Sequence, residues 1–111
     1  MTEPHTSARI VLTTTASPEE AAQMGRTLVE ERLAACATLL PGVQSIYRWE
    51  GAIESSVETM LLLKTGADQV AALEARLHQL HSYETPEFLV LAVDAGSQRY
   101  LDWLKASLLP A

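Results

Sequence analysis

The stretch LAACATLLPGVQSIYRWEG, residues 33–51, decides the fold. From Val43 to Trp49 the odd positions face one way and the even positions the other, which is the period of two of a half-buried strand. Pro41-Gly42 interrupts the stretch, and because proline has no amide proton to donate, a bend or bulge is predicted there. Alternation resumes at Ile53 and continues to Lys64. The two runs therefore predict one long β-hairpin that turns near Gly51.

The segments on both sides of this hairpin predict two more strands and three helices. Residues 9–15 are apolar and β-branched, and residues 88–93 form a continuously apolar run, typical of a strand covered on both faces. Ser17-Pro18-Glu19-Glu20 predicts a helix start, with Ser17 as N-cap and Glu20 completing a capping box. A second helix is predicted from a cap at Gly66 and Asp68 to about His81. A third follows the N-cap Ser97 and ends before Pro110.

This order of elements predicts an α+β fold, the ferredoxin-like βαββαβ arrangement with an added C-terminal helix. Its antiparallel sheet of four strands has helices on one face only, so something else must cover the other face. The long central hairpin carries Tyr47 and Trp49 near its tip, and a hairpin of this length projects beyond a core built from 111 residues. Exposed aromatic strand surface of this kind marks an interface, and an oligomer is expected.

Length and composition bound the class of protein. The chain has 111 residues, 48% of them hydrophobic, which predicts a polar tail at residues 1–8 and a single domain at residues 9–111. Its formal charge of −6 and pI near 4.9 argue against a nucleic-acid binder and against an electrostatic membrane anchor. Cys36 is the sole cysteine, so no internal disulfide can form. No secretion signal is recognisable, and a cytoplasmic protein is expected.

Four strings carry a resemblance to a known family. The stretch quoted above is followed in order by VETMLLLKT, HSYETPEFLVLAV and YLDWL. Together they resemble the CutA family of divalent-cation tolerance proteins, over nearly the whole chain from about Ile10 to Leu108. The resemblance implies a compact homotrimer in which the sheets pack together. It also implies a non-catalytic part in the response to divalent metal ions, with copper binding and a PII-like regulatory or scaffold role.

Metal ligation is therefore the first chemistry to consider. His78 and His81 are spaced so that they could share an ion from one helix face, but two histidines at a helix C-terminus also interact favourably with the helix dipole without binding a metal. The resemblance implies copper ligation by a cysteine on the first strand and two adjacent histidines. The corresponding residues here are Thr13, Leu80 and His81, so only His81 remains as a candidate ligand for copper or another divalent cation. Cys36, among alanines, is expected to be buried and inert.

A second constellation consists of polar and aromatic residues at strand ends, namely Trp49, Glu50, Lys64, Tyr83, Glu84 and Thr85. In a trimer these parts could meet in a cleft between subunits and bind a small molecule. Alternatively, the aromatic residues pack the interface while Glu50 and Lys64 form intersubunit ion pairs. An enzyme is the competing function, with Glu50 or Glu84 as general base and Lys64 orienting an anionic substrate. The partners expected are therefore further copies of the chain, a divalent metal ion, and a small ligand or protein still to be identified.

Overall fold

The structure is a computed structural model that describes residues 6–110 of the chain. The tail predicted for residues 1–8, which includes His5, lies outside the described residues up to residue 5. The elements are, in order, β1 (Ala8–Thr15), α1 (Pro18–Glu30), β2 (Cys36–Trp49), β3 (Ala52–Gly66), a 3₁₀ turn (Ala67–Gln69), α2 (Val70–Leu80), β4 (Leu89–Ala92) and α3 (Gln98–Ala106). Among the described helices, none has the length and apolar character needed to cross a membrane.

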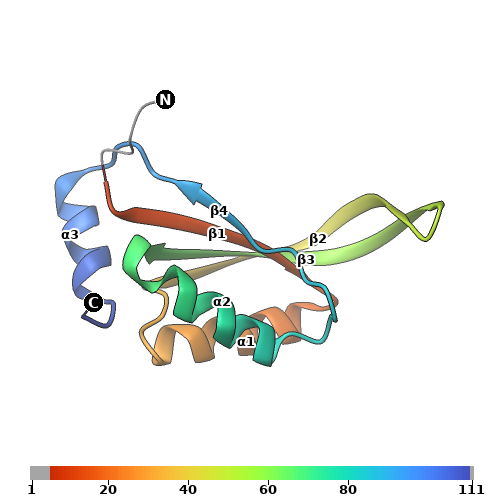
Figure 1. Ribbon diagram of the computed structural model, residues 1–111, viewed down its shortest axis with the longest axis horizontal. Coiled ribbons are helices and arrows are strands. Elements are labelled where there is room, and N and C mark those ends of the chain that lie inside the picture. The colour runs from red at the N-terminus through yellow and green to blue at the C-terminus, as the bar shows by residue number, and fades with distance from the viewer. Residues whose placement is uncertain (1–5, 111) are drawn as a thin grey trace.

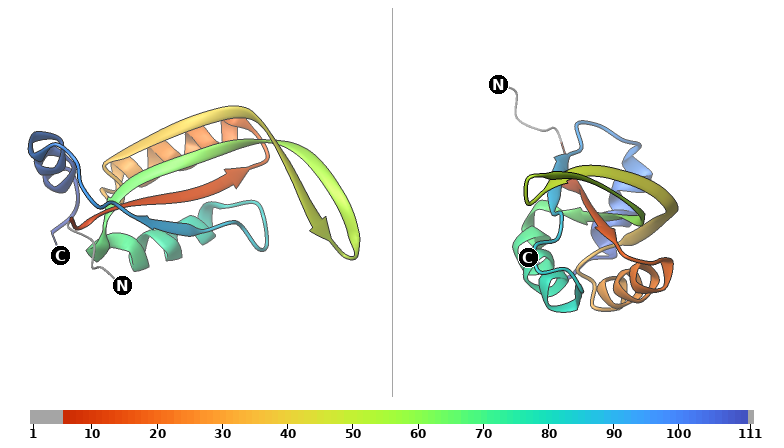
Figure 2. Two further views of the ribbon diagram at one scale, coloured as in Figure 1. Left: turned by 90° about the horizontal axis from the view of Figure 1, so that it is seen from above. Right: turned by 90° about the vertical axis from the view of Figure 1, so that its right-hand side faces the viewer.

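The four strands form one antiparallel sheet in the order β2-β3-β1-β4 (Figure 1). This is the order expected of a ferredoxin-like fold, and the predicted α+β class is confirmed. Helices α1 and α2 lie side by side against one face of the sheet, while α3 packs at the end opposite the hairpin tip (Figures 1 and 2). The hairpin of β2 and β3 extends well beyond the helices.

Two local features shape this hairpin as predicted. The register of β2 on β3 shifts between Leu40 and Val43, where Pro41-Gly42 forms the expected bulge and Gly42 has φ +76°. At the tip, Trp49 pairs with Ala52 across a two-residue turn in which Glu50 has φ +50° and Gly51 has φ +83°. Positive φ at both central positions is the signature of a type I′ turn, whose twist matches that of the strands.

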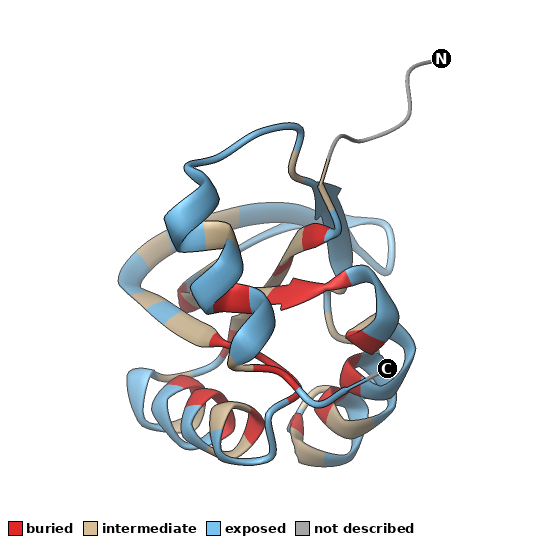
Figure 3. Cartoon of the chain, turned by 90° about the vertical axis from the view of Figure 1, so that its left-hand side faces the viewer, coloured by how far each residue is buried: buried red, intermediate tan, exposed pale blue. Residues whose placement is uncertain are grey.

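The core lies between the sheet and the first two helices. On β1 and β3, Val11 and Thr13 pair with Leu63 and Leu61, and all four are fully buried against the helices. We call this side of the sheet the helix-covered face. The helices contribute a cluster of apolar side chains, namely Met24, Leu28, Leu73 and Leu77. Figure 3 shows the buried residues gathered along these strands and on the inner sides of the helices.

The opposite side of the sheet is apolar as well, and no helix covers most of it. The strand register places seven apolar side chains on this side, and we call it the open face: Ile10, Leu12, Leu40, Met60, Leu62, Leu89 and Leu91. None of the seven is fully buried, and Leu40, Leu89 and Leu91 are about half exposed. The prediction that residues 88–93 are covered on both faces is therefore wrong within one chain, because Leu89 and Leu91 of β4 lie on the open face, where about half of their surface stays exposed.

Three further predictions are settled by local geometry. Ser17 caps α1, since its hydroxyl accepts a hydrogen bond from the Glu20 amide at 3.1 Å, but the Glu20 carboxylate bonds the amide of Ala16 rather than that of Ser17. Asp68 makes no side-chain capping bond, because a 3₁₀ turn with Gly66 as its N-cap precedes α2. Cys36 is half-buried rather than buried, with its Sγ 3.7 Å from the Thr38 hydroxyl.

Candidate functional site

A groove of about 720 Å³ lies where the hairpin leaves the body of the sheet. Three strands and the segment between α2 and β4 build its walls. Its main lining side chains are Thr14 from β1, Tyr47 and Trp49 from β2, Glu58 and Met60 from β3, and Tyr83, Glu84, Thr85 and Glu87 from the segment. Glu58 and Met60 alternate with the buried Thr59 and Leu61, so the groove opens on the same side of the sheet as the open face.

Four of the six predicted cleft residues line this groove, namely Trp49, Tyr83, Glu84 and Thr85. The other two lie elsewhere in the chain. Glu50 occupies the hairpin turn, and Lys64 sits near the far end of β3, where its Nζ lies 5.8 Å from the centroid of the Tyr100 ring on α3. A general base and Lys64 are therefore not brought together within one chain.

The strongest polar contact in the groove joins two residues that are 25 positions apart. The Tyr83 hydroxyl donates a hydrogen bond of 2.7 Å to Oε2 of Glu58. Glu58 is buried and only 8% exposed. Burial and this hydrogen bond raise the pKa of Tyr83 well above its ordinary value, so the hydroxyl stays protonated at neutral pH. Sequence reasoning missed Glu58, although a carboxylate directly before the run TMLLL is a signal that could have found it.

A hydrogen-bonded chain positions Tyr83 at the edge of the groove. His81 is buried, accepts the Tyr83 amide proton at Nδ1 (3.0 Å) and contacts the carbonyl oxygen of Thr14 through Nε2 (2.8 Å). Because Nδ1 acts as acceptor, the ring proton is on Nε2 and donates to Thr14. The Glu20 carboxylate accepts from both the amide and the hydroxyl of Ser82, at 2.9 and 3.0 Å. Burial raises the pKa of Glu20, but the Ser82 bonds outweigh this and leave that pKa below its ordinary value.

The same contacts bear on the metal prediction. Both ring nitrogens of His81 are occupied, Thr13 lies fully buried with its hydroxyl inside the core, and Leu80 has no donor atom. The ring of His78 packs against Phe88, with ring centroids 6.3 Å apart. Within the described residues, no three side chains of His, Cys, Asp or Glu are grouped closely enough to hold an ion. The residues at the positions implied by the resemblance therefore do not form a copper site in one chain.

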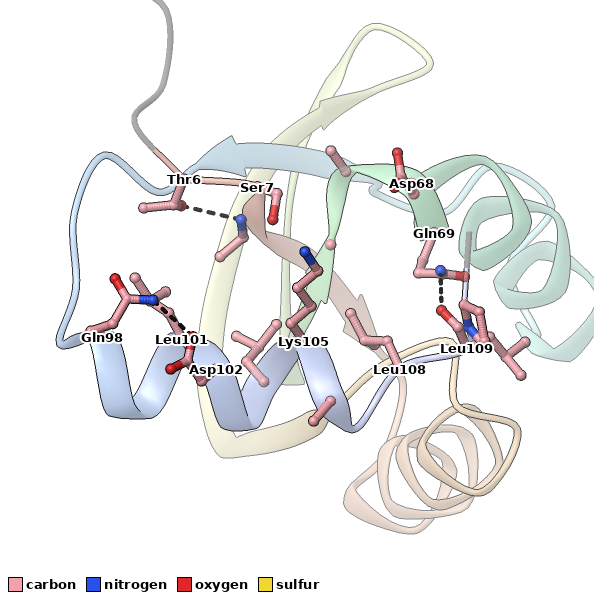
Figure 4. A pocket seen from close by; sticks show the side chains of 16 residues that line it. Thr6, Ser7, Asp68, Gln69, Gln98, Leu101, Asp102, Lys105, Leu108 and Leu109 are labelled. Atoms are coloured by element: carbon pink, nitrogen blue, oxygen red, sulfur yellow. Dashed lines mark hydrogen bonds between the residues drawn. The ribbon is translucent and has the colours of Figure 1, made fainter.

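A second hollow, of about 550 Å³, lies at the opposite end of the molecule between α3, the start of β1 and the 3₁₀ turn (Figure 4). Two of its polar side chains form hydrogen bonds with other residues that line the hollow. Gln69 donates from Nε2 to the carbonyl oxygen of Leu109 at 2.7 Å, and Gln98 donates to Asp102 at 2.8 Å. The Gln69 bond ties the end of the chain to the 3₁₀ turn, while Leu104 and Leu108 pack against Ala8. We therefore interpret this hollow as part of the junction where α3 packs against the rest of the chain.

The fold and the groove together define a class: a ferredoxin-like α+β protein with a projecting hairpin, an uncovered apolar sheet face and an aromatic, acidic groove at the hairpin base. Comparison with known proteins identifies the family. Residues 9–107 match the family model described as CutA1 divalent ion tolerance protein. The chain therefore belongs to the CutA family.

Relatives and solved structures agree with this assignment. The protein named divalent-cation tolerance protein CutA from Pectobacterium atrosepticum is 45% identical over 105 residues, covering 95% of this chain and 96% of that protein. The protein of the same name from Yersinia pestis is 44% identical, covering 98% and 95%. The crystal structure of CutA from Xylella fastidiosa is similar with a TM-score of 0.90 at 41% identity, covering 92% of this chain and 98% of that one. Cut A1 from Thermus thermophilus gives 0.89 at 42% identity, covering 91% and 98%.

Proposed function

We propose that the protein works as a homotrimeric, non-catalytic member of its family in the tolerance of divalent cations, in a regulatory or scaffold role. The names of its relatives support the part concerning divalent cations. The single observation that carries the assembly is the open face. Seven apolar side chains lie together on it, and monomeric proteins rarely leave a contiguous apolar surface of this kind in water.

The projecting hairpin exposes further apolar residues, of which Trp49 lies on the same side as the open face and Ile46, Ile53 and Val57 lie on the other side. Ile46, Trp49, Ile53 and Val57 are each more than half exposed in one chain. Packing the open faces of three copies together would remove the seven open-face side chains from water, at roughly 25 cal/mol per Å² of apolar area buried. The long hairpin extends past the helices of its own chain (Figure 2), which gives each copy an arm for contact with a neighbour.

In this proposal, a site for copper or another divalent cation belongs to the assembly rather than to one chain. Because His81 has both ring nitrogens engaged, a metal ion bound by the trimer must draw its ligands from more than one chain or displace a hydrogen bond of His81. A trimer that acts as a scaffold or signals to a partner needs no resident metal at all.

Native mass spectrometry of the reduced protein, with and without copper, tests both parts. We expect a trimer, and little copper uptake in the parent and in a His81→Ala variant alike. A monomer at micromolar concentration would contradict the assembly. Uptake of one copper per subunit that is lost in His81→Ala would show that His81 recruits ligands across the interface.

A small-molecule sensor is the second candidate function, and the groove favours it. Trp49, Tyr83, Glu84 and Thr85 converge there as expected of a binding site with a few polar groups among aromatic walls. The enzyme form of this idea has less support, because Lys64 and Glu50 lie outside the groove of their own chain. A trimer whose melting temperature is unchanged by every metabolite tested would count against a sensor.

A further inference from the structure

Among residues 6–110, no positively charged side chain is paired with the carboxylate of Glu58. Its residue is 8% exposed, and the described residues give it one hydrogen bond, from the Tyr83 hydroxyl to Oε2. An ionised carboxylate can accept about four hydrogen bonds. Burying one costs several kcal/mol unless it is paired and hydrogen-bonded. Oε1 of Glu58 has no hydrogen-bond partner among the described residues and is not sealed from solvent, so it can accept a donor from a ligand.

The walls of the groove match such a donor. Tyr47, Trp49 and Tyr83 supply aromatic rings, and in one chain Tyr47 and Trp49 are about half exposed where they line the groove. Aromatic faces attract organic cations within about 6 Å of the ring centre. Glu84 and Glu87 add negative charge, and the described lining includes no lysine, arginine or histidine. Charge and aromatic surface thus favour the same kind of ligand.

An organic cation fits the groove better than a metal ion does. A divalent metal needs several ligands converging on one point, and the carboxylates of Glu58, Glu84 and Glu87 do not form such a group. A protonated amine needs one carboxylate for its N–H groups and an apolar wall for its carbon chain. Glu58 and the two exposed aromatic rings provide these two parts.

We propose that this groove binds a small protonated amine, with the ammonium group donating to Glu58 and the alkyl part lying against Trp49 and Tyr47. This assignment rests on the second candidate function given above and names its ligand class. Arg48, exposed on the same hairpin, is a cation that a neighbouring copy of the chain could bring instead. The test must therefore separate a free amine from a partner's arginine.

The experiment titrates the intact, assembled protein and follows the NMR signal of the Trp49 indole N–H, with Trp103 on α3 as the internal reference. The probes are n-butylammonium, n-butanol and butyrate, which share a four-carbon chain and differ in charge. We expect a saturable shift of the Trp49 signal with n-butylammonium alone. Equal shifts with n-butanol or butyrate would leave a small-molecule site but overturn its preference for cations. No shift with any probe would overturn both the ligand class and the sensor.

Two variants identify the group responsible. Glu58→Gln keeps the shape and the bond from Tyr83 but removes the charge, and it should weaken n-butylammonium binding about tenfold or more, the size of one charge-assisted hydrogen bond. Tyr83→Phe removes the hydroxyl and keeps the carboxylate, so binding should persist. Equal loss in both variants would overturn the proposal in favour of a purely structural pair. Binding that appears only in an Arg48→Ala variant would overturn it in favour of the neighbouring copy's arginine.

Discussion

The two faces of the sheet are built from alternate residues of the same strands, yet they end in opposite environments. On β3, Leu61 and Leu63 are fully buried under α1 and α2, whereas Met60 and Leu62, which alternate with them, belong to the open face. Across the sheet the contrast is larger, since Leu89 on β4 is 53% exposed. A period of two thus assigns side chains to faces, but it does not determine what covers each face. Helices of the same chain cover the helix-covered face. The apolar side chains of the open face need another molecule to cover them.

The largest expected effect comes from truncating the helix-covered face. Leu61→Ala leaves a cavity among Val11, Leu28 and Leu77 and should reduce the free energy of unfolding by about 2–5 kcal/mol. Because this contact lies within one chain, the loss in urea denaturation should be the same at every protein concentration.

Leu89→Ala on the open face is the matched control. If copies of the chain cover Leu89, its loss should depend on protein concentration, since dilution dissociates the assembly and exposes the side chain in parent and variant alike. A loss for Leu89→Ala that does not change with dilution would contradict the proposed difference between the faces.

The hairpin tip gives the next largest effect. Trp49 is 57% exposed in one chain, and Trp49→Ala should weaken assembly by about 2 kcal/mol or more, because buried aromatic residues dominate interface energetics. Size-exclusion chromatography with light scattering over a dilution series measures this. Trp103→Ala, which removes a similarly exposed tryptophan from α3 at the other end, should have the smaller effect. A Trp49→Ala trimer as resistant to dilution and heat as the parent would refute the role of the tip.

The local part of this structure follows from the sequence. The hairpin with its bulge at Pro41-Gly42, the turn at Gly51 and the N-caps Ser17 and Ser97 were all predicted, because each depends on residues a few positions apart. The order of these elements was enough to predict the ferredoxin-like fold. Four of the twelve residues that line the candidate groove were also predicted, since these four stand at strand ends outside the apolar runs.

The errors concern contacts between distant residues. The bond from Tyr83 to Glu58 and the bonds from Ser82 to Glu20 span 25 and 62 positions, and no local pattern encodes them. Glu20 was expected to serve only its own helix. Lys64 was predicted to meet the other cleft residues between subunits of a trimer, and this stays a prediction, because within one chain the antiparallel register places it at the end of the sheet away from the hairpin tip. The exposure of β4 was missed because an apolar run has the same sequence pattern whether the residues that cover it belong to the same chain or to another one.

Glu20 links the two regions, since it starts a helix on the covered side and holds the segment that forms the groove. Its lowered pKa means that its stabilising effect is fully present above the unfolded pKa, near 4.3, and is lost as pH falls through the lower pKa of the folded state. Glu20→Gln should therefore cost about 1–2 kcal/mol at pH 7 and much less near pH 3, as measured by urea denaturation. The exposed Glu19→Gln serves as control and should change stability only slightly. If Glu20→Gln and the parent differ in free energy of unfolding by the same amount at both pH values, the charge assignment is refuted.

The smallest expected effect concerns a buried hydroxyl without a hydrogen-bond partner on the helix-covered face. The hydroxyl of Thr13 is fully buried and, among the described residues, has no hydrogen-bond partner. Thr13→Val replaces it with a methyl group of similar size and should raise the free energy of unfolding by about 1 kcal/mol, because a buried unpaired hydroxyl costs about that much. Thr15 is equally buried on the same face of β1, but its hydroxyl donates to the carbonyl oxygen of Ser17 at 2.8 Å. Thr15→Val should therefore lower stability by about 1 kcal/mol. Opposite signs for these two substitutions would show that hydrogen bonding, and not the removal of a hydroxyl as such, sets the stability of this face.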